Sequence, residues 1–173
     1  MMLGDSAMVF DFSKFVLDVD VGKTRKYYDT AHYVSELCSC DGCRNFEKVI
    51  DSLSPKVISF FSQLGIDMKK IREVYVNCAN ADNSIFYGGF YHVCGKLVEG
   101  ESAWVSVSSI EKHWEEEKTF SITDDFKVSF QEECYMLETN FPLPSIQLEI
   151  SADIPWVLAE PNNYDKDMTR RRS

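Results

Sequence analysis

The chain has 173 residues, a formal net charge of −10 and 45% apolar residues. This length suits one domain, and the apolar content is enough to form a core and too high for a disordered chain. An acidic surface repels phosphate backbones, so the composition argues against nucleic-acid binding. No apolar stretch approaches the roughly 18 residues of a membrane span, and residues 1–8 lack the features of a signal peptide. We therefore expect a cytoplasmic protein that makes no membrane contact.

The first half of the chain predicts a strand followed by helices. Apolar residues alternate with polar ones over 12–21, which indicates a half-buried strand. Spacings of three and four favour an amphipathic helix over 24–37, with a short turn at 24–28 as the alternative. A longer apolar stripe at helical spacing runs from Phe46 to Leu64 and is interrupted by Pro55. Because Ser54 can cap a helix and Gly65 can end one, we predict two successive helices, over 42–52 and 55–64.

The second half predicts mainly strands. Alternating residues over 71–79 and an aromatic run over 85–98, separated by turn-forming residues, indicate an antiparallel hairpin. Gly88 and Gly89 within it indicate a bulge or a close backbone contact. Further strands are predicted at 104–107, 126–130 and 146–150. The pattern from Ser108 to Glu111 has the form of a capping box, so we predict a short acidic helix over 109–117.

This order of elements predicts one α+β domain over residues 9–161. Its sheet would be mostly antiparallel, and a helical insert at about residues 42–64 would cover one face. We expect residues 1–8 and 162–173 to be flexible, the latter because the basic Arg170, Arg171 and Arg172 follow a polar stretch.

The most distinctive motif is a cysteine knuckle at Cys38, Cys40 and Cys43, preceded by His32. One interpretation is a metal site, because zinc takes four ligands from thiolates and imidazoles, and these four residues would supply them. A second is thiol redox chemistry, because Cys40 and Cys43 form a C-x-x-C pair at a predicted helix N-terminus, where a thiolate is stabilised. A third is purely structural packing of a tight turn.

The other cysteines and histidines carry weaker signals. Without a signal peptide we expect the six cysteines to be reduced, and Cys78, Cys94 and Cys134 lie in strand-like surroundings where thiols act as small apolar groups. His92 is expected to be a hydrogen-bonded sheet residue. Nucleotide-binding, nucleophile-elbow and H-E-x-x-H motifs are not found, so the sequence does not predict an enzyme.

Several segments resemble a family of uncharacterised bacterial proteins, chiefly from Gram-positive bacteria. The most specific are the Cys38-x-Cys40-x-x-Cys43-Arg44-Asn45-Phe46 knuckle and the ending Pro155-Trp156-Val157-Leu158, and the similarity covers most of residues 12–161. The resemblance implies a bacterial cytoplasmic protein and transfers no catalytic residue.

Two functions follow as hypotheses. The first is a non-enzymatic module that binds another protein, which the charge predicts to be basic. Immunity proteins, which neutralise toxins, share its size and charge, and this analogy goes no further. The alternative is a small zinc-binding or thiol-redox protein that uses Cys38, Cys40 and Cys43.

Overall fold

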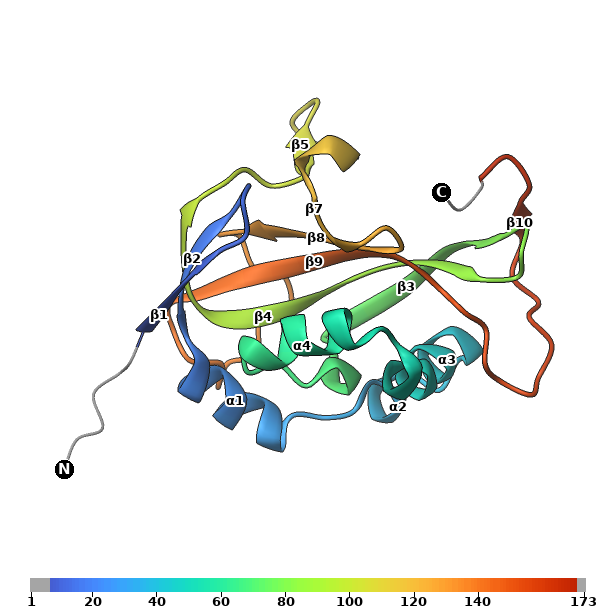
Figure 1. Cartoon of the computed structure of the whole chain (residues 1–173), viewed down its shortest axis with the longest axis horizontal. Coiled ribbons are helices and arrows are strands. Elements are labelled where there is room, and N and C mark those ends of the chain that lie inside the picture. The colour runs from blue at the N-terminus through green and yellow to red at the C-terminus, as the bar shows by residue number, and fades with distance from the viewer. Residues whose placement is uncertain (1–6, 171–173) are drawn as a thin grey trace.

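An eight-stranded sheet forms the centre of the protein, and the helices lie along one of its faces (Figure 1). The computed structural model describes residues 7–170. The strand order is β1-β2-β4-β9-β8-β7, and β3 pairs with both β4 and β10. All pairs in this sheet are antiparallel except β3–β10. The predicted class is confirmed: α+β, with a mostly antiparallel sheet and a helical insert over one face.

The strands of the sheet are β1 (Ala7–Asp11), β2 (Val16–Asp20), β3 (Glu73–Asn80), β4 (Ile85–Glu99), β7 (Phe120–Thr123), β8 (Phe126–Gln131), β9 (Ser145–Ile154) and β10 (Lys166–Asp167). The long β4 organises them, because one of its edges pairs with β9 while the other pairs first with β3 and then with β2. The predicted β3–β4 hairpin is confirmed. Its glycines meet close neighbours: a Cβ on Gly89 would lie 2.4 Å from the Glu73 carbonyl oxygen.

The helices are α1 (Val21–Thr30), α2 (Val34–Leu37), α3 (Asp41–Val49) and α4 (Pro55–Gln63), with short 3-10 turns η1 (Ile50–Ser52) and η2 (Met68–Lys70). The predicted start and stop of α4 are confirmed, since Ser54 Oγ accepts the Lys56 N–H and Gly65 adopts a φ of +85°. The predicted helix over 24–37 is divided. The Glu36 carboxylate accepts the Tyr33 N–H at 3.0 Å, which starts a new helix at Val34.

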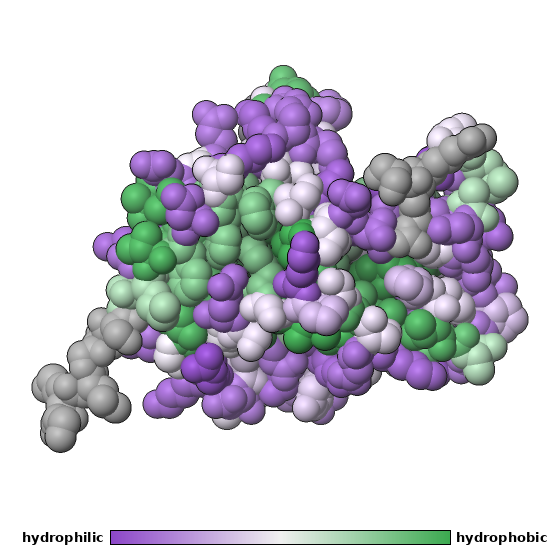
Figure 2. Space-filling view, viewed as in Figure 1, coloured by the Kyte–Doolittle hydropathy of each residue, from purple (hydrophilic) through white to green (hydrophobic). Residues whose placement is uncertain are grey.

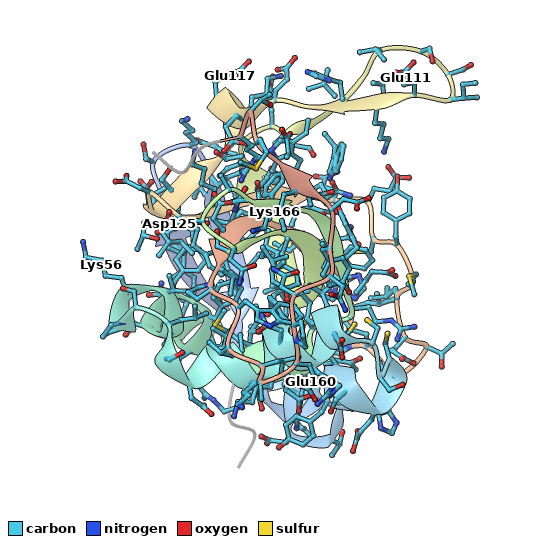
Figure 3. The ribbon with its side chains drawn as sticks, turned by 90° about the vertical axis from the view of Figure 1, so that its right-hand side faces the viewer. Lys56, Glu111, Glu117, Asp125, Glu160 and Lys166 are labelled. Carbon is cyan, nitrogen blue, oxygen red and sulfur yellow. The ribbon has the colours of Figure 1, made fainter. Side chains whose placement is uncertain are left out.

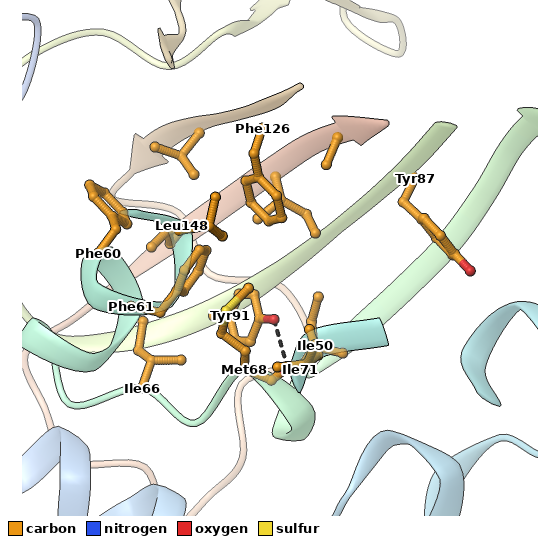
Figure 4. Close-up of a cluster of buried hydrophobic side chains, with 14 of the residues drawn as sticks. Ile50, Phe60, Phe61, Ile66, Met68, Ile71, Tyr87, Tyr91, Phe126 and Leu148 are labelled. Atoms are coloured by element: carbon orange, nitrogen blue, oxygen red, sulfur yellow. Dashed lines mark hydrogen bonds between the residues drawn. The ribbon is translucent and has the colours of Figure 1, made fainter. Parts of the chain in front are cut away.

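The core lies between the helices and the sheet (Figure 4). Phe61 of α4, Leu64 at the end of that helix, and Tyr91 and Leu148 of the sheet are completely buried. Burial of each such side chain stabilises the fold by about 1.5–3 kcal/mol. The Tyr91 hydroxyl, which lies in this apolar environment, donates to the Met68 carbonyl oxygen at 2.7 Å. Its polar atom is therefore satisfied as buried groups require.

Two of the predicted local elements differ from the structure. The predicted helix over 109–117 is wrong: Lys112–Trp114 form strand β6, which pairs with β5 (Trp104–Ser106), and η3 (Glu116–Lys118) follows. Ser108 Oγ accepts the Glu111 N–H within the connecting turn, so this pattern closes a hairpin instead of capping a helix. The strand predicted over 12–21 is confirmed as β2 and is shorter than predicted, because residues 12–15 form the turn that joins it to β1, with Ser13 at a φ of 67°.

The flexibility predicted for residues 1–8 and 162–173 stays a prediction, and the described parts of both segments include strands. Ala7 and Met8 belong to β1, and Lys166 and Asp167 form β10 beside β3. Arg170 forms an ion pair with Asp153, which holds the segment in place after β10. Residues 1–6 and 171–173 lie outside the described part of the chain.

An arm formed by β5, β6 and η3 (residues 104–118) rises from the face of the sheet opposite the helices (Figure 1). In the side view it carries Glu111 and Glu117 away from the sheet, whereas Glu160 lies near the helices (Figure 3). Hydrophilic residues cover most of the arm and the helices (Figure 2). Among residues 7–170, no helix has the length and apolar character needed to cross a bilayer.

The strand residues beneath the arm form a buried polar layer. The predicted sheet histidine, His92, is 2% exposed, and its Nε2 lies 3.1 Å from Gln147 Oε1. Gln147 Nε2 donates in turn to Glu149 Oε1 at 2.6 Å. Burial lowers the pKa of His92 and raises that of Glu149, because both environments disfavour the charged form. Of the thiols predicted to be buried among strands, Cys94 is buried, whereas Cys78 and Cys134 are partly exposed.

Candidate metal centre

The turn between α2 and α3 brings the three predicted thiols together. Cys38 is the C-cap of α2, Cys40 is the N-cap of α3, and Cys43 lies in the first turn of α3. Their Sγ atoms all lie within 4.8 Å of one another, and the Cys38 and Cys40 sulfurs are 3.2 Å apart. Cys38 and Cys40 are exposed and Cys43 is buried. The cluster is therefore anchored in the core on one side and open to solvent on the other.

Local backbone geometry explains this convergence. Cys40 is extended, with φ −67° and ψ 159°, and its sulfur accepts the Cys43 N–H at 3.5 Å in the manner of a helix N-cap. Asp41 is the first residue of α3, and its carboxylate accepts a hydrogen bond from Arg44 Nη1 at 2.9 Å. The N-cap of α3 is therefore a cysteine sulfur, and Cys40 and Cys43 both lie at the start of this helix.

His32 does not join the cluster. Its Nδ1 lies 3.0 Å from Glu36 Oε2, and its side chain is 71% exposed. The carboxylate that caps α2 thus also holds the imidazole. Among the described residues, the group of neighbouring histidine, cysteine and carboxylate ligands that contains these sulfurs has three members, Cys38, Cys40 and Cys43. The candidate zinc set predicted from the sequence therefore lacks its fourth ligand.

The three thiols differ in their electrostatic environment. Hydrogen bonds from the Cys40 backbone N–H and from the neighbouring thiols lower the pKa of Cys38, because they stabilise its thiolate. Burial raises the pKa of Cys43, since the thiolate loses its hydration there. Cys38 is therefore the thiol that ionises more readily, and Cys43 requires a cation beside it to do so at neutral pH.

Gly42 is held from two sides by tyrosines that the sequence did not identify. The Tyr87 hydroxyl donates to the Gly42 carbonyl oxygen at 2.8 Å, and the Tyr164 hydroxyl accepts the Gly42 N–H at 3.0 Å. A Cβ at this position would lie 2.7 Å from the Tyr164 oxygen and 2.8 Å from a Val76 methyl carbon, so only glycine fits without movement. Asn45 Nδ2 donates to the Tyr87 hydroxyl at 3.1 Å and extends the support.

The sulfur positions fit zinc without rearrangement of the backbone. Zn–S bonds of about 2.3 Å at tetrahedral angles place sulfurs about 3.8 Å apart. In this cluster the Cys38 and Cys40 sulfurs are closer than that, at 3.2 Å, and the upper limit of the sulfur separations, 4.8 Å, is larger. Because Cys38 and Cys40 are exposed, their side chains are free to make the change of up to about 1 Å in sulfur separation that zinc ligation requires. Three thiolates also form the soft donor set that favours zinc over calcium or magnesium.

Protein-family models, curated proteins and solved structures include no match to this chain. The resemblance of the knuckle and the Pro155–Leu158 ending to a bacterial family stays a prediction. The functional proposals below are therefore based on the geometry of the chain itself.

Proposed function

We propose that the protein binds one zinc ion through the thiolates of Cys38, Cys40 and Cys43, with the fourth coordination position open to solvent. The observation that carries the proposal is the convergence of the three sulfurs within 4.8 Å of one another. Three protein ligands and an open position distinguish reactive or exchangeable zinc sites from closed structural ones. A water molecule, or a ligand from a bound partner, would complete the tetrahedron.

The residues around the thiols suit this role. The Cys43 sulfur is fixed because its side chain is buried, and Tyr87 and Tyr164 fix the backbone of Gly42. The fold therefore already orders part of the site before the metal binds. Hydrogen bonds that favour the Cys38 thiolate provide one ligand that is easily deprotonated. The zinc ion, when bound, would act as a Lewis acid at its open position.

The proposal is tested by metal analysis of protein purified without chelators. We expect about one zinc per chain, and a cobalt-substituted sample should show thiolate-to-metal absorption. The Cys38→Ser, Cys40→Ser double variant should lose both signals, because a single thiolate remains. Cys134→Ser is the matched control, since that thiol lies in a different part of the fold and contacts Ser145. Less than about a quarter of an ion per chain in the wild-type protein would overturn the proposal.

The rate of thiol labelling separates metal binding from thiol redox chemistry. Redox use is favoured by one observation, an exposed Cys38 of lowered pKa whose sulfur lies 3.2 Å from that of Cys40. A redox protein would give rapid labelling of Cys38 at neutral pH in metal-free and metal-loaded samples alike. Zinc binding predicts that labelling slows strongly when the ion is added, because thiolates bonded to zinc are shielded.

We also propose that the protein is a cytoplasmic module that binds a basic protein. Its support is the net charge of −10 together with an aromatic cavity beneath the arm. Tyrosine and tryptophan are the residues that contribute most to protein interfaces. A pull-down from lysate tests it: a partner retained by the wild-type protein and released by salt supports the proposal, and no partner above background contradicts it.

A further inference from the structure

A cavity of about 410 Å³ lies between the sheet, the arm and the C-terminal segment. Aromatic residues from four strands line it, among them Tyr75 of β3, Phe86 of β4, Trp104 of β5 and Trp114 of β6. Gly88 forms part of its surface, and a Cβ there would lie 2.5 Å from the Tyr75 ring. The absence of a side chain at Gly88 therefore lets that ring lie against the sheet. The volume falls within the range of ligand pockets, about 300–1,000 Å³.

The protein already places one of its own cations in this cavity. The Arg170 guanidinium carbon lies 3.5 Å from the centre of the Phe86 ring, in a cation–π contact. Its Nη1 also donates to Asp153 and, at 2.8 Å, to Asn80 Oδ1. One wall of the cavity thus already binds a guanidinium group, between the aromatic face of Phe86 and the carboxylate of Asp153.

The remaining walls have the same chemistry. Trp114 Nε1 donates to Glu116 Oε2 at 2.9 Å, and the Trp104 side chain hydrogen-bonds to the Glu149 carboxylate. The two indoles meet edge to face with centroids 5.0 Å apart. A carboxylate that accepts an indole N–H adds negative potential at the ring, which strengthens attraction of a cation to its face. Both indoles are therefore backed by carboxyl groups, of which that of Glu116 is also paired with Lys127 Nζ at 2.7 Å.

From this arrangement we infer that the cavity binds the guanidinium group of an arginine side chain from a basic partner protein, beside Arg170. The inference rests on the second proposal above, that the protein binds a basic partner. Arginine is favoured over lysine because its planar group stacks on aromatic faces and is less strongly hydrated. The net charge of −10 would attract a basic partner over a distance and make the association sensitive to salt.

The test uses the full-length protein and three short glycine–serine peptides, which carry a central arginine, lysine or uncharged citrulline. Tryptophan fluorescence reports binding, and calorimetry confirms it. We expect saturable binding of the arginine peptide. The citrulline peptide should bind at least about tenfold more weakly, because it lacks the positive charge and therefore the cation–π contact. Trp114→Leu should weaken binding about tenfold. Trp156→Phe is the matched control, because Trp156 packs against Tyr164 and donates to the Glu160 carbonyl oxygen outside this cavity.

Because Trp114→Leu could weaken binding by disrupting the fold of the arm, a second variant outside the arm is needed. Arg170→Ala exposes the Phe86 face and frees Asp153, so we expect it to bind the arginine peptide several-fold more tightly. Equal binding of arginine and citrulline peptides, or equal effects of Trp114→Leu and Trp156→Phe, would overturn the inference. If a lysate partner is retained while the arginine peptide does not bind, this site is disproved and protein binding survives. If the peptide binds while no lysate partner is found, the arginine site survives and the partner proposal fails.

Discussion

Replacement of Tyr87 by phenylalanine should loosen the thiol cluster from within the core. The Tyr87 side chain is completely buried, and its hydroxyl makes two hydrogen bonds, to the Gly42 carbonyl oxygen and from Asn45 Nδ2. Each lost hydrogen bond costs about 0.5–1.5 kcal/mol, so the variant should be destabilised by about 1–3 kcal/mol. For a chain of this size, a loss of 2 kcal/mol lowers Tm by about 4–8 °C.

The consequence for the metal is the informative part of this prediction. Gly42 lies between Cys40 and Cys43, so release of its carbonyl increases the freedom of both sulfurs before binding. If about half of the 1–3 kcal/mol appears as extra ordering cost, zinc affinity falls about two- to twelvefold. Denaturant unfolding of the metal-free protein measures the first effect, and competition with a chromophoric chelator measures the second.

Tyr91→Phe supplies the control. Tyr91 is equally buried, and its hydroxyl donates one hydrogen bond, to the Met68 carbonyl oxygen, away from the thiols (Figure 4). We expect a loss of about 0.5–1.5 kcal/mol in stability and unchanged zinc affinity. Equal zinc affinity in the Tyr87→Phe, Tyr91→Phe and wild-type proteins would refute the reasoning, because it would mean that the turn orders its own sulfurs.

Three further substitutions test the fold. Because burial raises the pKa of Glu149, its charged form is disfavoured in the folded state, and this penalty appears as pH rises through the ordinary glutamate value near 4.5. Chemical unfolding should therefore show Glu149→Gln gaining stability relative to wild type as the pH rises above about 4.5, and a difference that does not change with pH would contradict this. Gly65→Ala should cost about 1–3 kcal/mol, since φ is +85° and the new Cβ would lie 2.6 Å from the Val21 oxygen. Gly22→Ala, where the nearest atom is 3.6 Å away, should instead add about 0.5 kcal/mol, as thermal unfolding can show.

Local signals explain which parts of the fold could be predicted. The boundaries of α4 follow from Ser54, Pro55 and Gly65, whose effects act within a few residues. The strands of the central hairpin follow from alternation over their whole length. The helix prediction for residues 109–117 was wrong because its capping pattern spans only four residues. The pairing of Trp104 with Trp114 across the arm decides the conformation of this segment. A two-residue parallel strand such as β10 carries no periodicity at all.

The candidate site shows the same division. Cys38, Cys40 and Cys43 converge because they share one turn, and their spacing alone predicts that they lie close together. His32 is also near in sequence, but Glu36 competes for its imidazole. The supporting Tyr87 and Tyr164 are 45 and 122 positions from Gly42, a separation over which sequence patterns carry no contact information.

Residues 164–170 join two parts of the molecule, the thiol turn and the aromatic cavity. At one end Tyr164 closes over the backbone amide beside the sulfurs, and at the other Arg170 occupies the aromatic cavity. A chain shortened after residue 161 would lose both contacts at once together with β10, although it would keep every other strand and every helix. The thiol turn and the aromatic cavity therefore depend on the same short segment of chain.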